Sequence, residues 1–298
     1  MNTFFQGTDV VKDRLYRDIR SAPNPYFQKA QRLTECMWAG CAHFVDDNAR
    51  ERARKDDFYA VWWELYVAYA LSSSGISLVP TKDRRPSVGK GRPDLLTENP
   101  RIWIEAVMPH AGTGPDALSE PPMNVVYSVP TEAYVLRLRT AIEEKVFKLD
   151  QYLKEGTIQS GDATIIAVSG ARLPFRFSEP PIPRIVRAVC AVGCPVLEID
   201  LATRERLGTT VQFRDHVLKK SNAPVRTDLF TEKQSAHVSA VLYSASDCVN
   251  HTQEPGADFI LVHNPNAMVP IAENWLPVGD QYWIENDVLR RACASDDR

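Results

Sequence analysis

The chain has 298 residues, of which 44% are hydrophobic, and its 35 Lys and Arg against 38 Asp and Glu give a formal net charge of −3. This composition excludes a wholly disordered chain and a generic polycation of the histone or ribosomal kind. A membrane-spanning helix is not expected, because the sequence contains no run of about 18 apolar residues. The near-neutral total does not exclude a nucleic-acid partner, since binding depends on where the charges lie.

The cysteines and the N-terminal segment indicate in which cellular compartment the protein is expected. The cysteines are Cys36, Cys41, Cys190, Cys194, Cys248 and Cys293. They are too few for a disulfide scaffold, so we expect buried free thiols in a reduced, cytoplasmic protein. The N-terminal segment lacks the apolar stretch of a secretory signal. Cys36, Cys41 and His43 follow no common zinc-ligand spacing, and we do not interpret them as a metal site.

The first quarter of the chain is predicted to be helical. Helices are expected over residues 4–20, 25–55 and 58–74. Asn24 and Pro25 can begin the second of them, and Asp56 or Asp57 can cap the third. The third helix is apolar or aromatic at every position from Phe58 to Leu71 except one, which predicts that it is buried on all sides.

A mixture of strands and helices follows. Strands are expected over residues 76–80, 93–97, 101–107, 163–170, 195–201, 209–214, 238–244 and 257–264, and helices over 131–155 and 184–192. Residues 108–130 are predicted to form a long loop because of their prolines and glycines, and residues 265–298 peripheral loops with a terminal helix. Apolar strands interleaved with helices predict an α/β fold with a central mixed β-sheet flanked by helices.

No segment has the composition of a linker, so one main domain is expected. It covers residues 58–298, with a core at 58–170 and a C-terminal extension of the sheet. Residues 1–57 are interpreted as a helical N-terminal extension, which could mediate dimerisation or cover the site. The sequence alone does not choose between these roles.

The single exception in the apolar third helix is Glu64. An ionised carboxylate in such surroundings is costly unless it is paired or binds a metal. Two interpretations therefore stay open. Glu64 is either bonded to a buried arginine or backbone group, or it is a ligand or orienting group in a polar site.

Two further carboxylates are expected to lie together at the hairpin of strands 93–97 and 101–107. Glu105 shares one face of its strand with the apolar Trp103 and Val107. Asp94 begins the preceding strand, and a tight hairpin places the start of one strand beside the end of the next. Together with Glu64 they would make an oxygen-rich site that suits Mg²⁺ or Mn²⁺.

Glu64 on its helix, Gly91-Arg92-Pro93-Asp94 and Ile102-Trp103-Ile104-Glu105-Ala106-Val107 together resemble the PD-(D/E)xK nuclease superfamily, which has the restriction-endonuclease-like fold. The order of the predicted elements from residue 58 to residue 170 is similar to the core of that fold. The resemblance implies that Glu64, Asp94 and Glu105 bind one or two divalent cations. It also implies metal-assisted attack of water on a phosphodiester.

The resemblance is incomplete at one position. The superfamily places a lysine two residues after the second acidic residue, where this chain has Val107. In some members that lysine has moved to the following helix. Here Lys145 lies in an apolar stripe with Leu138, Ile142, Leu149 and Tyr152, and Lys148 is a second choice at the edge of the stripe. Lys145 is therefore a catalytic lysine, a lysine that extends along the apolar face to water, or part of an unrelated ion pair.

Basic residues cluster just before two of the acidic ones. Residues 82–92 contain Lys82, Arg84, Arg85, Lys90 and Arg92, and we expect these side chains to contact the phosphates of nucleic acid. Residues 50–55 carry a second basic run, although either cluster could be only a solvated surface. His110 and His263 follow strands and are weaker candidates for a base near the site.

The expected function is thus a divalent-metal-dependent nuclease, with DNA favoured over RNA as the partner. The alternative is a catalytically inactive nuclease-like fold that binds nucleic acid or protein, which Val107 favours. An α/β protein with an unrelated small-molecule activity is a third hypothesis. The spatial arrangement of the three carboxylates and Lys145 discriminates among them, whereas oligomeric state and sequence specificity stay open.

Overall fold

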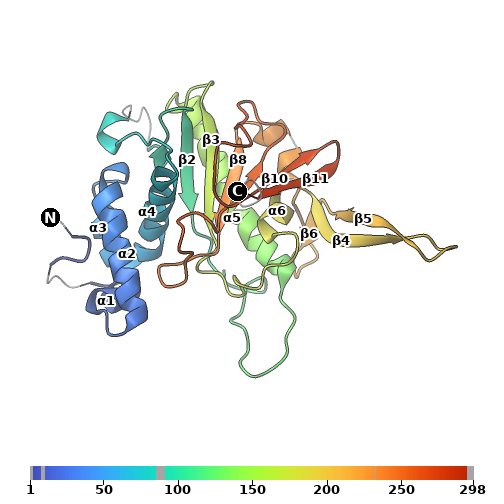
Figure 1. Cartoon of the computed structure of the whole chain (residues 1–298), viewed down its shortest axis with the longest axis horizontal. Helices are drawn as coiled ribbons and strands as arrows, with labels where there is room; N and C mark the ends of the chain where they lie inside the picture. The colour runs from blue at the N-terminus through green and yellow to red at the C-terminus, as the bar shows by residue number, and fades with distance from the viewer. Residues whose placement is uncertain (1–2, 8–10, 85–90, 232, 294–298) are drawn as a thin grey trace.

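The structure is a computed structural model that describes residues 3–7, 11–84, 91–231 and 233–293. Its main helices are α1 (Arg14–Ser21), α2 (Pro25–Cys41), α3 (Ala49–Arg52), α4 (Phe58–Ser73), α5 (Thr131–Lys154) and α6 (Arg184–Val189). Its strands are β1 (Leu95–Leu96), β2 (Ile102–Val107), β3 (Ala163–Ser169), β4 (Val192–Ile199), β5 (Arg206–Phe213), β6 (His216–Leu218), β7 (Pro224–Arg226), β8 (Ala240–Ser244), β9 (Ile260–His263), β10 (Asp280–Glu285) and β11 (Val288–Cys293). The expected α/β fold with a mixed sheet is confirmed (Figure 1).

A seven-stranded sheet in the order β1-β2-β3-β8-β9-β10-β11 forms the centre of the molecule. Strands β2, β3 and β8 run parallel to one another, whereas β1 pairs with β2 in the antiparallel sense. Helix α5 connects β2 to β3, which is the crossover that a parallel pair requires. The carboxyl ends of β2 and β3 therefore lie side by side at one end of the sheet.

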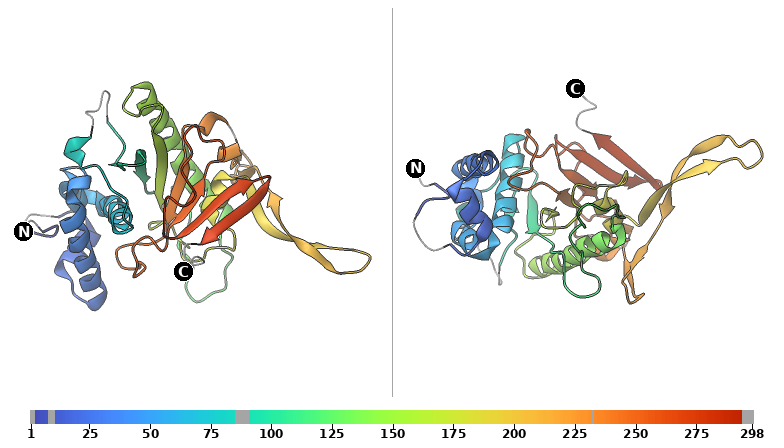
Figure 2. Two further views of the ribbon diagram at one scale, coloured as in Figure 1. Left: turned by 45° about the horizontal axis from the view of Figure 1, so that its top comes forward. Right: turned by 90° about the horizontal axis from the view of Figure 1, so that it is seen from below.

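Two hydrophobic clusters cover the two faces of this sheet. Figures 1 and 2 show α4 and α5 on opposite sides of β2. On one face, Ile102 and Ile104 pack in a cluster that contains α4 and the N-terminal helices. On the other face, Trp103 packs in a cluster that contains α5 and α6. Alternation along β2 thus divides its side chains between the two layers, as the sequence pattern predicts. No helix in the described ranges is both long and apolar enough to cross a membrane.

The N-terminal helices are shorter than predicted. Helix α1 begins only at Arg14, because the Asp13 carboxylate caps it by accepting from the Tyr16 amide at 2.9 Å. Phe4 and Phe5, expected in this helix, lie outside it. The predicted helix over 25–55 is interrupted between Cys41 and Ala49, although Asn24 caps its start as expected.

The region before α4 departs from regular geometry. Residues Ala53–Asp57 form a π-helical turn that contains a non-helical Asp56. Asp57 occupies the capping position of α4 but makes no capping hydrogen bond with its side chain, so the predicted aspartate cap is wrong. π-Helical turns are frequent near functional sites, and this one leads directly into the helix that carries Glu64.

The strand predicted over 76–80 is also wrong. Among the described residues this segment contributes only a bridge between Leu78 and Thr97. The hairpin of β1 and β2 is present, but β1 has only two residues. The edge of β2 near Glu105 is therefore left without a full neighbouring strand.

The C-terminal segment corrects a further prediction. In place of the expected terminal helix, β10 and β11 form an antiparallel hairpin that completes the sheet. Asn286 and Asp287 connect the two strands with positive φ angles of 49° and 61°. Such angles are typical of the tight turns that join strands with the usual right-handed twist.

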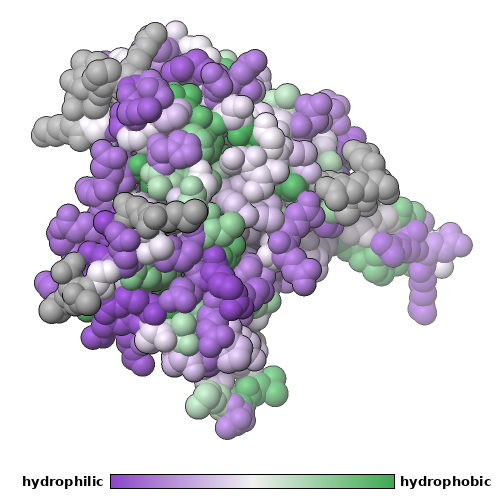
Figure 3. All heavy atoms as spheres, turned by 60° about the vertical axis from the view of Figure 1, so that its left-hand side comes forward, coloured by the Kyte–Doolittle hydropathy of each residue, from purple (hydrophilic) through white to green (hydrophobic). Residues whose placement is uncertain are grey.

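Strands β4 and β5 form a separate two-stranded ribbon that projects from the sheet, and the loop before α5 projects at the bottom of Figure 1. The predicted strands 195–201 and 209–214 thus exist but do not belong to the central sheet. Figure 3 shows the opposite end of the molecule, where the surface over the N-terminal helices is mainly hydrophilic.

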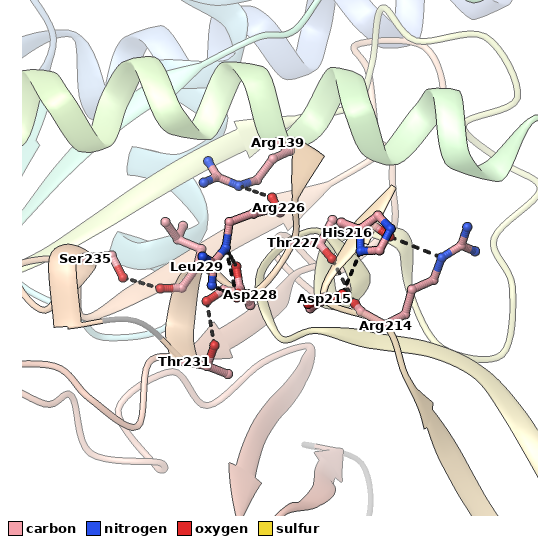
Figure 4. A network of polar contacts seen from close by, with 10 residues as sticks. All are labelled: Arg139, Arg214, Asp215, His216, Arg226, Thr227, Asp228, Leu229, Thr231 and Ser235. Atoms are coloured by element: carbon pink, nitrogen blue, oxygen red, sulfur yellow. Dashed lines mark hydrogen bonds and ion pairs between the residues drawn. The ribbon is translucent and has the colours of Figure 1, made fainter. Parts of the chain in front are cut away.

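A polar network ties the segment after the ribbon to α5 (Figure 4). Arg139 of α5 donates from Nε to the carbonyl of Arg226 at 2.8 Å, and Arg226 pairs with Asp228. The hydroxyl of Thr231 donates to the Asp228 carbonyl at 2.8 Å. These contacts fix one side of the helix whose other side reaches the candidate site.

All six cysteines are free, but only part of the cysteine prediction is correct. Cys41, Cys190 and Cys248 are buried thiols as expected. Cys36 and Cys194 are exposed, which contradicts the expectation of burial for them.

Candidate active site

The short hairpin places Asp94 beside Glu105. Leu95 lies opposite Ile104 in the register of β1 and β2. Continuing that register by one residue places Asp94 opposite Glu105, on the same face of the sheet. Asp94 Oδ2 accepts a hydrogen bond from the Ala106 amide at 2.6 Å, which holds the carboxylate against the unpaired edge of β2. The sequence spacing therefore brings these two carboxylates together as expected.

Glu105 is the most enclosed charged group of the site, with an exposed fraction of 0%. Its Oε1 accepts from Lys145 Nζ at 2.6 Å and from Lys148 Nζ at 2.7 Å. Its Oε2 is buried and has no hydrogen-bond partner within the described part of the chain. Because an unsatisfied buried carboxylate oxygen is costly, this atom is a vacant acceptor for a donor or a cation.

Lys145 and Lys148 reach Glu105 from successive turns of α5. The stripe that predicts this placement is present, because Leu138, Ile142 and Leu149 are fully buried. The Lys145 side chain is only 19% exposed and ends on the carboxylate, so it does not extend along the apolar face to water. Lys148 is 42% exposed and lies 5.5 Å from the centre of the Tyr152 ring. A catalytic lysine and a purely structural ion pair are the interpretations that remain.

Glu64 faces the site from α4 but is already paired. Its Oε1 lies 2.5 Å from Arg52 Nη2, and its residue exposure is 7%. Burial raises the pKa of Glu64 to about 8, and the Asp94 carboxylate acts in the same direction while Arg52 opposes it. Both interpretations of Glu64 therefore hold in part, since it pairs with an arginine and also lines a pocket with Lys145.

That pocket has a volume of about 200 Å³ and opens where α4 meets the carboxyl end of β2. It is lined by Asp57, Ala60, Trp63, Glu64, Ala106, Val107, Met108, His110, Lys145 and Arg172. Val107 therefore shares the pocket with Lys145, which places an ammonium group of α5 beside the end of β2.

The three carboxylates do not form a ready-made metal cage. Among the described residues no group of three or more His, Cys, Asp or Glu side chains is placed to hold a metal ion. Asp94 and Glu105 lie opposite each other in the register of the hairpin, whereas Glu64 comes from α4 and is paired with Arg52. A cation at Asp94 and Glu105 would thus be the simplest arrangement that these positions allow.

The basic segment 82–92 is only partly available to a ligand. Arg84 is 5% exposed, and its guanidinium donates to the carbonyls of Val79 at 3.1 Å, Asp94 at 2.6 Å and Phe44. Its prediction as a nucleic-acid contact is therefore wrong, because the buried guanidinium uses its hydrogen bonds to hold the backbone before β1. Lys82 is exposed and Arg92 is half-buried. Arg85 and Lys90 lie outside the described residues.

The second basic run, 50–55, does not form a row of free cations. Arg52 binds Glu64, and Lys55 pairs with Glu51 at 2.8 Å. Arg50 donates to the carbonyl of Thr3 at 3.3 Å. The run therefore joins the N-terminal segment to the site rather than presenting a phosphate track.

The two histidines differ in their placement. His110 is exposed and lines the pocket, whereas His263 is buried on β9 with Nε2 2.7 Å from Gln281 Oε1. From the sequence, Arg52 was noted only as a member of the basic run 50–55, and Arg172 was not singled out. Arg172 could have been found from the topology, since it follows β3, whose carboxyl end lies beside that of β2.

The titration of Asp94 leads to a stability prediction. Burial raises the pKa of Asp94 to about 6, and Glu105 adds to this effect, while the Ala106 amide and both lysines oppose it. Because the pKa is higher in the folded than in the unfolded chain, folding is most favourable, with respect to this group, below about pH 4, where Asp94 is protonated in both states. The free energy of unfolding then falls as the pH rises through about 6 and Asp94 ionises in the folded protein. In metal-free buffer, Asp94→Asn should therefore be more stable than the wild type at pH 7, on the order of 1–3 kcal/mol in free energy of unfolding.

Urea unfolding in the presence of a chelator measures this difference at pH 4 and at pH 7. The gain should be absent at pH 4, where the wild-type carboxyl is already neutral. An Asp94→Asn variant less stable than the wild type at pH 7 would show that the charged carboxylate is favourably paired, contrary to this account.

Comparison of the chain with protein-family models, with curated proteins and with solved structures finds no match.

Proposed function

We propose that the protein is a divalent-metal-dependent nuclease that hydrolyses phosphodiester bonds of nucleic acid, with DNA favoured over RNA. The observation that carries the proposal is the contact of 2.6 Å between Lys145 Nζ and Glu105 Oε1, next to Asp94 and beside a pocket. The resemblance to the PD-(D/E)xK superfamily supports the same conclusion, with Lys145 in place of the lysine that is missing at Val107.

The residues present fit a hard divalent cation. Among the described residues Glu105 Oε2 is a buried acceptor without a hydrogen-bond partner, and Asp94 lies opposite Glu105 in the register of the hairpin. Mg²⁺ and Mn²⁺ prefer carboxylate oxygens and retain several water ligands. Asp94 and Glu105 would hold the cation, and Glu64 would assist after release from Arg52. The chemistry supplied by such a cation is charge stabilisation at the phosphodiester and activation of water at neutral pH.

The protein's own groups then have distinct roles. The Lys145 ammonium places a positive charge at the pocket, where the phosphate oxygens gain negative charge as water attacks. The Ala106 amide keeps the Asp94 carboxylate turned toward Glu105. Trp63 and Met108 line the pocket as apolar groups and limit the water around it, which strengthens these electrostatic contacts.

A non-catalytic nucleic-acid-binding or protein-binding role is the second candidate. The observation that favours it is that basic side chains of the protein already pair with Glu64 and Glu105. Arg52 binds Glu64, and two lysines share one oxygen of Glu105. A fold that had lost its metal would be stabilised by such pairs, because unpaired buried carboxylates are costly.

Cleavage assays separate the two candidates. The purified protein is incubated with supercoiled plasmid, linear duplex DNA, single-stranded DNA and single-stranded RNA, each with Mg²⁺, with Mn²⁺ or with EDTA. The proposal predicts metal-dependent cleavage of a DNA substrate that EDTA abolishes. Binding without cleavage of any substrate in either metal would favour the non-catalytic role.

A further inference from the structure

The carboxyl ends of two parallel strands bring two further polar residues to the pocket. Val107 of β2 lies opposite Val168 of β3, so the loops that follow these strands begin side by side. His110 lies in the first loop and Arg172 in the second, and both line the pocket that contains Glu64 and Lys145. Crevices at the carboxyl ends of parallel strands are common ligand sites in α/β proteins.

Arg172 is exposed, and its guanidinium lies 5.8 Å from the centre of the Tyr59 ring, which orients it. Within the described ranges it makes no ion pair. By contrast, Arg52 and Arg176 each bind a carboxylate, at 2.5 Å and 2.7 Å. A guanidinium without a carboxylate partner at the mouth of a pocket is suited to bidentate contact with a phosphate.

His110 lies in a cationic environment beside this guanidinium. Arg137 Nε donates to the His110 carbonyl at 3.1 Å and fixes the loop. Burial lowers the pKa of His110, and Arg172 and Arg137 lower it further, while Asp57 acts in the opposite direction. The imidazole is therefore neutral at pH 7, with one nitrogen able to donate to a phosphate oxygen.

The region of positive charge is small. Arg172 also lines a neighbouring hollow of about 360 Å³ together with Asp13, Asp18 and Asp56. These carboxylates would repel a phosphate on that side of Arg172. The pocket also contains two carboxylates, Asp57 and Glu64, but Arg52 pairs with both of them, at 3.8 Å and 2.5 Å. A phosphate is therefore favoured on the side that faces His110 and the pocket.

We propose that Arg172 and His110 form a phosphate subsite that holds a nucleic-acid strand at the phosphodiester adjacent to the one that is cut. This inference rests on the proposed function for the identity of the ligand. The subsite binds one phosphate of the backbone, and a contact of this kind positions the strand but carries no sequence information directly.

The test measures binding of a fluorescein-labelled single-stranded DNA oligonucleotide by fluorescence anisotropy, in EDTA and over a series of NaCl concentrations. Arg172→Ala should weaken binding roughly tenfold at low salt, since hydrogen bonds to charged groups are among the stronger ones. It should also reduce the slope of log K against log salt by about 0.7, the loss of one phosphate contact. Arg172→Lys should restore the slope, and His110→Ala should weaken binding without changing the slope.

Lys154→Ala is the matched control, because this lysine is exposed at the end of α5, its side chain is 72% exposed and it lies outside the pocket. It should bind as the wild type does. The inference is overturned if the wild type does not bind the oligonucleotide, or if Arg172→Ala binds with unchanged affinity and slope. It is also overturned if Arg172→Lys loses the slope as Arg172→Ala does, since Arg172 would then act only by stacking on Tyr59.

These outcomes are independent of turnover. Loss of binding in Arg172→Ala together with no cleavage by the wild type would retain the subsite and reject the nuclease. Cleavage by the wild type together with unchanged binding by Arg172→Ala would retain the nuclease and reject the subsite.

Discussion

Replacement of Glu105 by glutamine is expected to reduce metal-dependent cleavage by about 10²–10³-fold or more, a loss of the size seen when one preorganised charge-stabilising group is removed. The reason is that Glu105 contributes the only buried oxygen of the site that is left without a partner in the described structure. Glutamine preserves the shape but removes the charge that a cation requires. Initial rates at saturating substrate, measured with Mg²⁺ and with Mn²⁺, give the comparison.

The control for Glu105→Gln must account for lost stability, because Lys145 and Lys148 would be left without their carboxylate. Asp162→Asn is matched to it. Asp162 is another buried carboxylate, paired with Arg101 at 3.2 Å and bonded to Trp103 Nε1 at 3.0 Å at the opposite end of β2. Both variants should be destabilised, but only Glu105→Gln should lose turnover. Equal cleavage by Glu105→Gln and the wild type would reject the site.

The second large effect is expected at Lys145. Lys145→Ala should lower kcat by about 10²-fold with a small change in KM, because its ammonium lines the pocket and acts as charge develops. Lys148→Ala should cost less than about tenfold in kcat, since Lys148 is more exposed and lies outside the set of pocket-lining residues. The comparison uses two lysines that bind the same oxygen of Glu105.

A readout other than activity separates catalysis from structure here. Each lysine competes with a cation for Glu105, so Lys145→Ala should bind Mn²⁺ at least as tightly as the wild type while being nearly inactive. If the two lysine variants lose activity to the same extent, the assignment of Lys145 as the displaced catalytic lysine is wrong. Weaker Mn²⁺ binding by Lys145→Ala would contradict the competition between ammonium and cation.

The parts of the site that could be predicted from the sequence are those set by short-range periodicity. The apolar run around Glu64 predicts a buried helix, and the spacing of Asp94 and Glu105 predicts a hairpin that brings them together; both features are present. The stripe on α5 likewise predicts that Lys145 faces the sheet. In each case a period of 2 or 3.6 residues determines which side chains share a face.

The errors arise where the outcome depends on contacts distant in sequence. Arg84 belongs to a basic run that looks solvated, but it is buried by carbonyls of residues 44, 79 and 94. The pairing of Arg52 with Glu64 depends on the π-helical turn between their helices, which no periodicity indicates. Residues 76–80 lie beside the end of the two-residue β1, whose shortness limits their pairing to a single bridge between Leu78 and Thr97.

The incorrect prediction of a terminal helix, where the structure has a hairpin, has a different cause, because a local signal for the hairpin was present in the sequence. Asn286 and Asp287 are residues that tolerate positive φ, and they separate two short segments, 280–285 and 288–293, that contain aromatic and β-branched residues. This turn is a local signal for the hairpin of β10 and β11. The last strands of the sheet were thus within reach of sequence reasoning, whereas the identity of Arg52 as the partner of Glu64 was not.

Isothermal titration calorimetry with Mn²⁺ at pH 8 tests the central claim most directly, because it needs no knowledge of the substrate. At this pH Asp94, whose pKa is raised to about 6, is ionised. The account predicts that the wild type and Asp162→Asn bind Mn²⁺, whereas Asp94→Asn and Glu105→Gln bind it far more weakly. Absence of Mn²⁺ binding by the wild type, or equal binding by all four proteins, would contradict a metal site at Asp94 and Glu105.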